Sequence, residues 1–256
     1  MGRMICALTA LTLFGACSQV HTTPGAEYLA RYEATSKGAV IDREIREAAS
    51  VEPILTFPAR LGIAKINQGR MAGIRPTELK LWSEIAERNH RLGEFVAISP
   101  LIAEFADNSG RLNRTALFGD ARELVKKIRI GAARQHVDAV LVYGVDSAAH
   151  RDSTPLAFFD ITIIGGAILP TRKIEASAIA SALLIDVRNG YVYGTTTASA
   201  EDERLSVTWG AGGRTRKAGE RVVREAIRNL IPEVEKMVVM LATELERERG
   251  KPSAKS

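Results

Sequence analysis

The chain has 256 residues, of which 46% are hydrophobic, 25% charged and 5% aromatic, and its formal net charge is +5. These values are close to those of soluble globular proteins, so they exclude a disordered tail, a collagen-like chain and a polytopic membrane protein. Cys6 and Cys17 are the two cysteines, and both lie near the N-terminus. A disulfide scaffold and a zinc site built from cysteines are therefore excluded.

The N-terminal segment has the pattern of a bacterial secretion signal. Arg3 supplies a positive charge, and residues 4–16 then carry no charged side chain. This run is too short for a bilayer core, which requires about 20 residues. We therefore expect residues 1–16 to be removed as a signal peptide.

The signal ends in Leu13-Phe14-Gly15-Ala16-Cys17, which resembles the lipobox of bacterial lipoproteins. The resemblance implies that Cys17 becomes the first residue and carries the acyl chains that anchor the protein to a membrane. Ser18 stands where an aspartate would signal retention in the inner membrane, so the resemblance implies a periplasm-facing protein of the outer membrane. Cleavage after Cys17 or Ser18 by an ordinary signal peptidase is the alternative.

Residues 17–25 are polar and contain Pro24, so we expect a short lipidated tether. Residues 26–250 are expected to form a single periplasmic domain, and residues 251–256 a disordered tail.

The first half of this domain alternates between helix and strand patterns. A helix over 77–92 is predicted to have Thr77 as its N-cap, and Asp120 with Glu123 resembles a capping box. The predicted elements are a helix over 36–50, a strand over 60–66, the helix over 77–92, a strand over 94–99, a helix over 120–136 and a strand over 139–145. The resulting β-α-β-α-β order predicts a sheet with helices on its faces.

The second half changes to an antiparallel meander, because its strand candidates at 156–169, 176–186 and 191–200 leave no room for helices. Asn189-Gly190 predicts a type I′ hairpin turn. A helical pattern over 215–249 follows and contains Pro232, which kinks one helix or begins a second. The predicted fold class is therefore mixed α/β, with a central mixed sheet and helices at both termini.

Three strings resemble bacterial rhombotarget-type lipoproteins, a group of largely unknown role: Ala139-Val140-Leu141-Val142-Tyr143, Leu169-Pro170-Thr171-Arg172 and the stretch over 184–191. More distantly, the strand over 138–143 and the hairpin over 186–193 look like the periplasmic α/β domain shared by the curli secretion protein CsgG and the peptidoglycan-synthase activator LpoB. The resemblance covers roughly residues 60–200 and implies a fold rather than a reaction, since any such sheet needs these strand and turn formers.

No residue constellation identifies a reaction. The four histidines lack metal-ligand spacing, so we expect no metal and no cofactor. Asp160 and Asp186 are the carboxylates that a glycan hydrolase could use. We expect structural roles for both, with Asp186 preparing the hairpin turn.

Basic residues recur at spacings of 4, 3 and 4 and so share one helix face: Lys217, Arg221, Arg224 and Arg228. One interpretation is a solvated face balanced by Glu220 and Glu225. The other is a surface for an anionic partner, which could be lipid headgroups, lipopolysaccharide phosphates or an acidic protein.

These observations predict a membrane-anchored lipoprotein that acts as a non-catalytic binding or accessory/adaptor module of the cell envelope. Its partners are then the membrane, through Cys17, and an envelope protein, but not nucleic acid. The alternatives are a periplasmic hydrolase of an envelope glycan and a CsgG-like export subunit. A hydrolase requires an acid in a concave pocket, a pore requires exposed apolar hairpins, and an adaptor requires an exposed binding patch.

Overall fold

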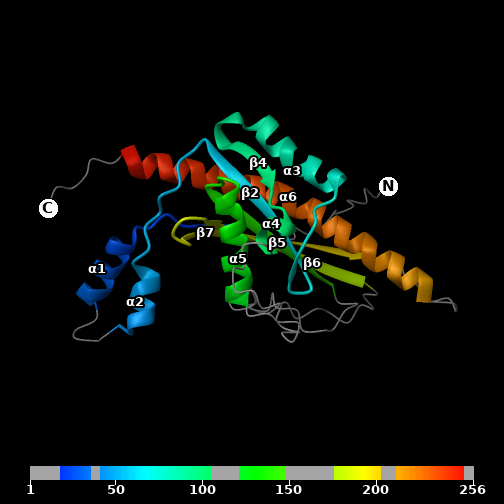
Figure 1. Ribbon diagram of the computed structural model, residues 1–256, viewed down its shortest axis with the longest axis horizontal. Helices are drawn as coiled ribbons and strands as arrows, with labels where there is room; N and C mark the ends of the chain where they lie inside the picture. The colour runs from blue at the N-terminus through cyan, green and yellow to red at the C-terminus, as the bar shows by residue number, and fades with distance from the viewer. Residues whose placement is uncertain (1–17, 36–40, 105–120, 148–175, 203–211, 251–256) are drawn as a thin grey trace, which may run out of the picture.

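The computed structural model describes residues 18–35, 41–104, 121–147, 176–202 and 212–250 (Figure 1). In chain order the elements are β1 (Ser18–Val20), α1 (Gly25–Thr35), α2 (Arg43–Ala49), β2 (Ala59–Asn67), β3 (Arg70–Ala72), α3 (Pro76–Arg88), the 3-10 helix η1 (His90–Leu92), β4 (Gly93–Ala97), α4 (Pro100–Glu104), α5 (Ala121–Arg134), β5 (Ala139–Ser147), β6 (Ala176–Asp186), β7 (Val192–Asp202) and α6 (Gly212–Gly250). The predicted mixed α/β class is confirmed.

The described strands form one seven-stranded mixed sheet in the order β1-β7-β6-β5-β2-β3, with β4 also paired to β2. β2 lies parallel to β4 and to β5, as the β-α-β-α-β pattern predicts. β5, β6 and β7 form an antiparallel meander, so β6 has a partner on each side; β6 and β7 correspond to the strands predicted over 176–186 and 191–200. The strand predicted over 156–169 lies outside the described residues.

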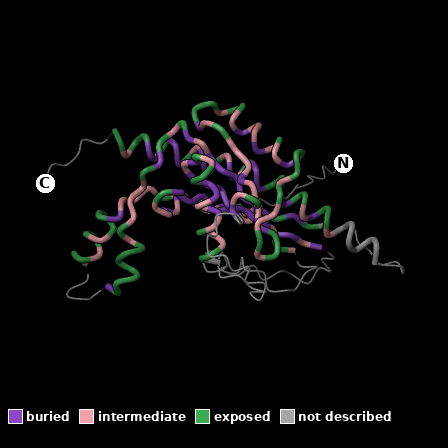
Figure 2. Tube along the Cα trace, viewed as in Figure 1, coloured by how far each residue is buried: buried purple, intermediate pink, exposed green. Residues whose placement is uncertain are grey.

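The hydrophobic core forms two clusters, one on each face of the sheet. Buried residues concentrate in the central part of the trace (Figure 2). Alternate residues of a strand point to opposite faces, so Leu141 joins one cluster and Val142 the other. α3 and α6 cover the first face, where Trp82 is fully buried, and α5 covers the second through Ile128.

α6 is a single helix of 39 residues that runs through Pro232. Of the two predicted outcomes, one continuous helix is therefore the correct one. Pro232 lacks the N–H that would bond to the carbonyl of Arg228, but it lies on the exposed side, where water can supply the donor. At 1.5 Å per residue the helix is about 58 Å long, and it extends along the whole molecule (Figure 1).

Several predicted helix boundaries need correction. α3 begins at Pro76 with Arg75 as its N-cap residue, not at Thr77, because a proline at the first helical position loses no helix hydrogen bond. It ends at Arg88, before the predicted Leu92. Only Arg43–Ala49 of the helix predicted over 36–50 is described as helix, and Asp120 lies outside the described residues.

The hairpin at Asn189-Gly190 exists, but the predicted type I′ turn is wrong. Gly190 has a φ of 80°, whereas Asn189 has no positive φ, and β6 ends at Asp186 while β7 starts only at Val192. The longer loop is held by side chains: the N–H groups of Arg188 and Gly190 donate to the Asp186 side chain and carbonyl, respectively.

The expected tether over 17–25 also needs correction. Ser18–Val20 forms β1, which pairs antiparallel with β7, so that Ser18 faces Thr196 and Val20 faces Gly194. A Cβ atom at Gly194 would lie 2.4 Å from the carbonyl oxygen of Gln19. Since real Cβ atoms do not approach a backbone oxygen so closely, glycine at 194 makes the space that β1 occupies.

Candidate functional site

The residue that follows the predicted lipidation site is fixed in the fold. Cys17 lies outside the described residues, but the hydroxyl group of Ser18 lies 2.7 Å from that of Thr196 and donates to the carbonyl of Glu233 at 3.4 Å. Consecutive Cα atoms are about 3.8 Å apart. Any group attached to Cys17 is therefore held within one residue of the edge of the sheet.

α6 packs beside this edge and runs in the same direction as β1. Ser18 contacts Glu233, and Gly194, the pairing partner of Val20, lies next to Met237 one turn further along the helix. The first part of α6 therefore projects beyond the start of β1. The helical rise places Arg221 about 18 Å before Glu233 along the helix axis.

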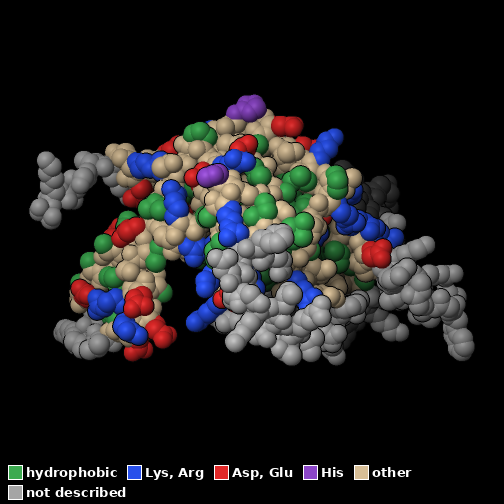
Figure 3. All heavy atoms as spheres, in the orientation of Figure 1, with side chains coloured by type: hydrophobic (Ala, Val, Ile, Leu, Met, Phe, Trp, Pro, Cys, Tyr) green, Lys and Arg blue, Asp and Glu red, His purple; other side chains and the backbone are tan. Residues whose placement is uncertain are grey.

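The basic face predicted from the 4-3-4 spacing lies on this projecting part of α6. Arg221, Arg224 and Arg228 are exposed, and Lys and Arg side chains gather over the same part of the helix in Figure 3. The guanidinium group of Arg224 lies 4.0 Å from the carboxylate of Glu220. Lys217 belongs to the helix, but its side chain lies outside the described residues. We call Arg221, Arg224 and Arg228 the arginine face.

Asp186 is fully buried and its two carboxylate oxygens are both hydrogen-bonded. Oδ1 accepts the N–H of Arg188 at 2.8 Å, and Oδ2 accepts the hydroxyl of Tyr193 at 2.9 Å. The Tyr193 hydroxyl in turn accepts the N–H groups of Ile54 and Leu55. Burial and the neighbouring carboxylate raise the pKa of Tyr193. Asp186 thus has the structural role that we predicted, whereas Asp160 lies outside the described residues.

A second buried carboxylate, Glu78, was not singled out from the sequence. It is only 6% exposed, accepts two hydrogen bonds from Lys65 Nζ at 2.8 and 2.9 Å, and accepts the hydroxyl of Tyr143 at 2.5 Å. Burial and the charge of Glu78 raise the pKa of Tyr143. Because Glu78 has a cation and a hydroxyl as partners inside the core, it serves to join α3 to β2 and β5.

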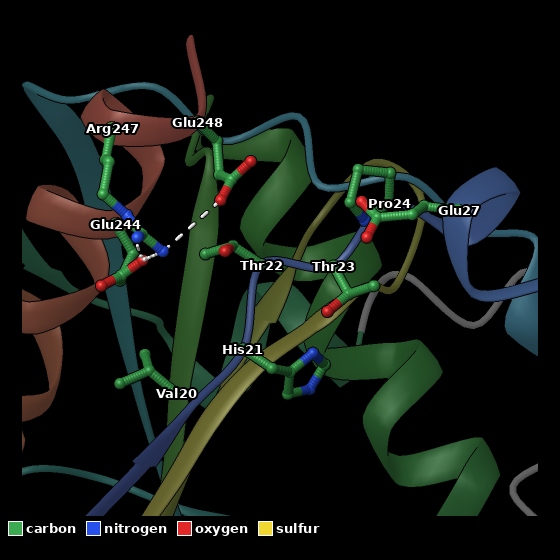
Figure 4. A pocket seen from close by; sticks show the side chains of 9 residues that line it. All are labelled: Val20, His21, Thr22, Thr23, Pro24, Glu27, Glu244, Arg247 and Glu248. Atoms are coloured by element: carbon green, nitrogen blue, oxygen red, sulfur yellow. Dashed lines mark hydrogen bonds and ion pairs between the residues drawn. The ribbon is translucent and has the colours of Figure 1, made fainter. Parts of the chain in front are cut away.

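A surface cavity of about 270 Å³ lies between the segment after β1 and the end of α6 (Figure 4). Arg247 points between Glu244 and Glu248, at 2.6 and 3.6 Å, so it offsets part of the negative charge of this cavity. His21, on the other side, lies 3.0 Å from the hydroxyl of Tyr191, and burial lowers its pKa. Within the described ranges, no three His, Cys, Asp or Glu side chains are placed to hold a metal ion.

The second cavity, of about 240 Å³, is an apolar groove between α1 and α2. It is lined mainly by Tyr28, Leu29, Tyr32, Ile41 and Ile45. Tyr28 is 49% exposed and Ile45 is 55% exposed. Figure 1 shows that α1 and α2 project from the end of the molecule opposite to the start of α6.

Sequence analysis missed α1, although two signals were present. Tyr28 and Tyr32 are four residues apart, and Glu27 and Arg31 form an i,i+4 ion pair at 3.3 Å. The adaptor hypothesis requires an exposed binding patch, and this apolar groove is one candidate for it.

Among the helices that the structure describes, none has the length and apolar character needed to cross a membrane. No family model and no curated protein sequence matches the chain. Similar solved structures include the dodecamer of a PelC variant from Paraburkholderia phytofirmans, with 12% identity, 70% of this chain and 92% of that chain covered, and a TM-score of 0.28.

Two further similar structures are a domain of LpoB and a lipoprotein. The C-terminal domain of LpoB from Salmonella enterica has 13% identity, 58% and 86% coverage of this chain and that chain, and a TM-score of 0.29. Lipoprotein GNA1162 from Neisseria meningitidis has 15% identity, 66% and 99% coverage, and a TM-score of 0.30. LpoB, to which the sequence bears a distant resemblance, is thus among the similar structures, but similarity at this level defines neither a family nor a role for this chain.

Proposed function

We propose that this protein is a lipid-anchored module of the bacterial cell envelope that binds another envelope component without catalysing a reaction. The observation that carries the proposal is the position of Ser18. It is the residue after the cysteine of the lipobox-like segment, and it already belongs to the sheet. The end of the predicted signal therefore coincides with the start of the fold.

Of the two alternative cleavage sites, the one after Ser18 fits this fold less well. Cleavage before or after Cys17 leaves all of β1 in the mature chain. Cleavage after Ser18 would remove the first residue of β1, together with its contacts to Thr196 and to the carbonyl of Glu233. The hydrogen bonds of Ser18 thus favour Cys17 as the first residue over Gln19.

The position of the apolar groove supports the binding role. Acyl chains on Cys17 would hold the start of β1 at the membrane, in our proposal that of the outer membrane. The groove between α1 and α2 lies at the opposite end of the molecule, where an envelope protein could reach Tyr28 and Ile45. Exposed apolar side chains gathered at one place are typical of binding surfaces.

Hydrolysis is less well supported by the described residues. Asp186, the one described member of the candidate carboxylate pair, has its oxygens bonded to Arg188 and Tyr193. It lines neither of the cavities described above. A binding role therefore explains the exposed apolar groove, whereas a glycan hydrolase would leave it without a function.

The anchor is tested by purifying the protein from membranes and measuring the mass of its N-terminal peptide. We expect a peptide that begins at acylated Cys17 and is absent in Cys17→Ala. Ser18→Ala is the matched control, because it removes the hydroxyl contact but keeps the cysteine. An unmodified N-terminus at any other residue contradicts the anchor.

The binding role is tested by photo-crosslinking in intact cells. A photoreactive residue in place of Tyr28 is expected to capture one envelope protein, which mass spectrometry identifies. The control position is Arg43 on α2, which is 85% exposed but does not line the groove. Capture from both positions alike, or from neither in the anchored protein, contradicts a role for the groove.

A further inference from the structure

We propose that the arginine face of α6 binds the phosphate headgroups of anionic phospholipids in the leaflet that holds the Cys17 acyl chains. This inference rests on the proposed function, because it takes the anchor at Cys17 as its starting point. It adds a second membrane contact and an orientation, neither of which follows from the anchor alone.

The first step is the position of β1 beside α6. Ser18 contacts Glu233, so the chain that enters β1 does so beside the middle of α6. Residues of α6 that precede Glu233 extend past this point. By the helical rise, Arg228 lies about 7.5 Å and Arg221 about 18 Å beyond it along the axis.

The second step is the short reach of the anchor. Cys17 is one residue from Ser18, which adds only about 3.8 Å. A flat surface that holds the acyl chains of Cys17 therefore meets the first turns of α6 before it meets the opposite end of the molecule. The α1–α2 end is then raised from the bilayer (Figure 1).

The third step is the chemistry of the side of α6 that remains available. Val222, Ala226 and Leu230 are buried, so the apolar side of this segment is already used by the domain core. The side that can meet a membrane carries the arginine face. Contact is therefore electrostatic, at the level of the headgroups, and involves no insertion of apolar side chains.

Guanidinium groups suit phosphate, because their planar donors bind two phosphate oxygens at once. Within the arginine face, Arg224 pairs with Glu220, whereas Arg228 has no ion pair with any described residue; at the opposite end, Arg43 and Arg46 pair with Glu47 and Glu33. One basic residue near an anionic surface contributes roughly a fivefold preference, or about 1 kcal/mol. Neutralising two arginines should thus lower the equilibrium constant for the membrane-contacting orientation about 25-fold.

The test uses the acylated protein purified from membranes. Its acylated Cys17 is blocked, so a cysteine introduced as Glu225→Cys is the single free thiol of the mature chain and accepts a fluorescent donor. The protein is reconstituted in vesicles of phosphatidylcholine, with or without phosphatidylglycerol, that contain an acceptor dye on the headgroups. We expect stronger energy transfer in the phosphatidylglycerol vesicles and a loss of this difference in high salt.

The variant Arg224→Gln/Arg228→Gln is expected to abolish the difference between the two vesicle types. The matched control, Arg43→Gln, should leave it unchanged, and thermal unfolding should be the same for all variants because these side chains are exposed. Equal transfer in both vesicle types, or a difference that survives Arg224→Gln/Arg228→Gln, overturns the headgroup contact while the anchor stands. An unacylated N-terminus, seen by mass spectrometry before reconstitution, overturns the anchor and this inference together.

Discussion

The two ends of the molecule are built in different ways although both derive from the first fifty residues. At one end, β1 is held by a backbone ladder to β7 and by the hydroxyl contact of Ser18 with Thr196. At the other, α1 and α2 contact each other and leave Tyr28 and Ile45 half-exposed. The first end has a defined position and the second has free apolar surface, so the first suits an anchor and the second suits a binding site.

The largest effect is expected from Gly194→Val, which should expel β1 from the sheet. A Cβ at this position would lie 2.4 Å from the Gln19 carbonyl, and the backbone of a strand cannot yield as a side chain can. We expect a loss of about 2–4 kcal/mol in the free energy of unfolding, measured with denaturant. Gly73→Ala is the matched control, because nothing lies within 4 Å of its Cβ position. Equal stability of the two variants would show that the pairing of β1 does not require glycine at position 194.

Tyr193→Phe should loosen the connection between the two ends. The Tyr193 hydroxyl accepts the N–H groups of Ile54 and Leu55, in the segment that leads from α2 to β2, and donates to Asp186. Its removal leaves buried groups without partners, at a cost of about 1–3 kcal/mol. Amide exchange should accelerate around Leu55 and not in β1. Faster exchange in β1 as well would mean that the two ends are coupled.

Alkaline pH should destabilise the fold through its buried tyrosines. Burial raises the pKa of Tyr191 to about 12, and the pKa values of Tyr143 and Tyr193 also lie above their usual value. Above pH 10 these tyrosines lose protons in the unfolded chain but keep them in the fold, so the unfolded state binds fewer protons and stability falls. The free energy of unfolding should fall by at most about 1.4 kcal/mol per pH unit for each tyrosine.

Tyr191→Phe should reduce the dependence of the free energy of unfolding on pH. Denaturant unfolding between about pH 9 and pH 12, the range in which tyrosines titrate, measures this dependence. The Tyr191 hydroxyl donates to the carbonyl of Thr23, just after β1. A dependence that Tyr191→Phe leaves unchanged would assign the alkaline loss to the other tyrosines.

The smallest effect on stability is expected from Ile45→Ser. Ile45 is 55% exposed, so its truncation removes little buried area and should cost less than about 1 kcal/mol. Capture of the envelope partner from the groove should nevertheless fall strongly. A large loss of stability, seen in the thermal midpoint, would instead make the groove part of the core.

The centre of the sheet could be predicted from the sequence because its signals are local. β6 has the predicted bounds, 176–186, since an apolar run ends at the turn-forming Asp186. β1 could not be found in this way. Three residues of ordinary polarity form a strand only because Gly194, far along the chain, leaves room for them.

The candidate site shows the same limit. Spacing along one helix was enough to place Arg221, Arg224 and Arg228 on a common exposed face. Nothing in that spacing relates the helix to Cys17. The relation arises from the order of the sheet, which puts β1 at its edge and α6 beside it.

The position of β1 directly after Cys17, where a tether was predicted, has a consequence for how the protein would encounter a partner. In the proposed anchored form, acyl chains on Cys17 would confine the domain to diffusion in the plane of the membrane with little freedom to tumble, because Ser18 is hydrogen-bonded in the sheet. Encounter with another membrane-bound protein then becomes a two-dimensional search between molecules that face each other at a set height. Much of the orientational entropy that free proteins lose on association is lost at anchoring instead. A groove of modest area can therefore serve as a selective contact without high intrinsic affinity.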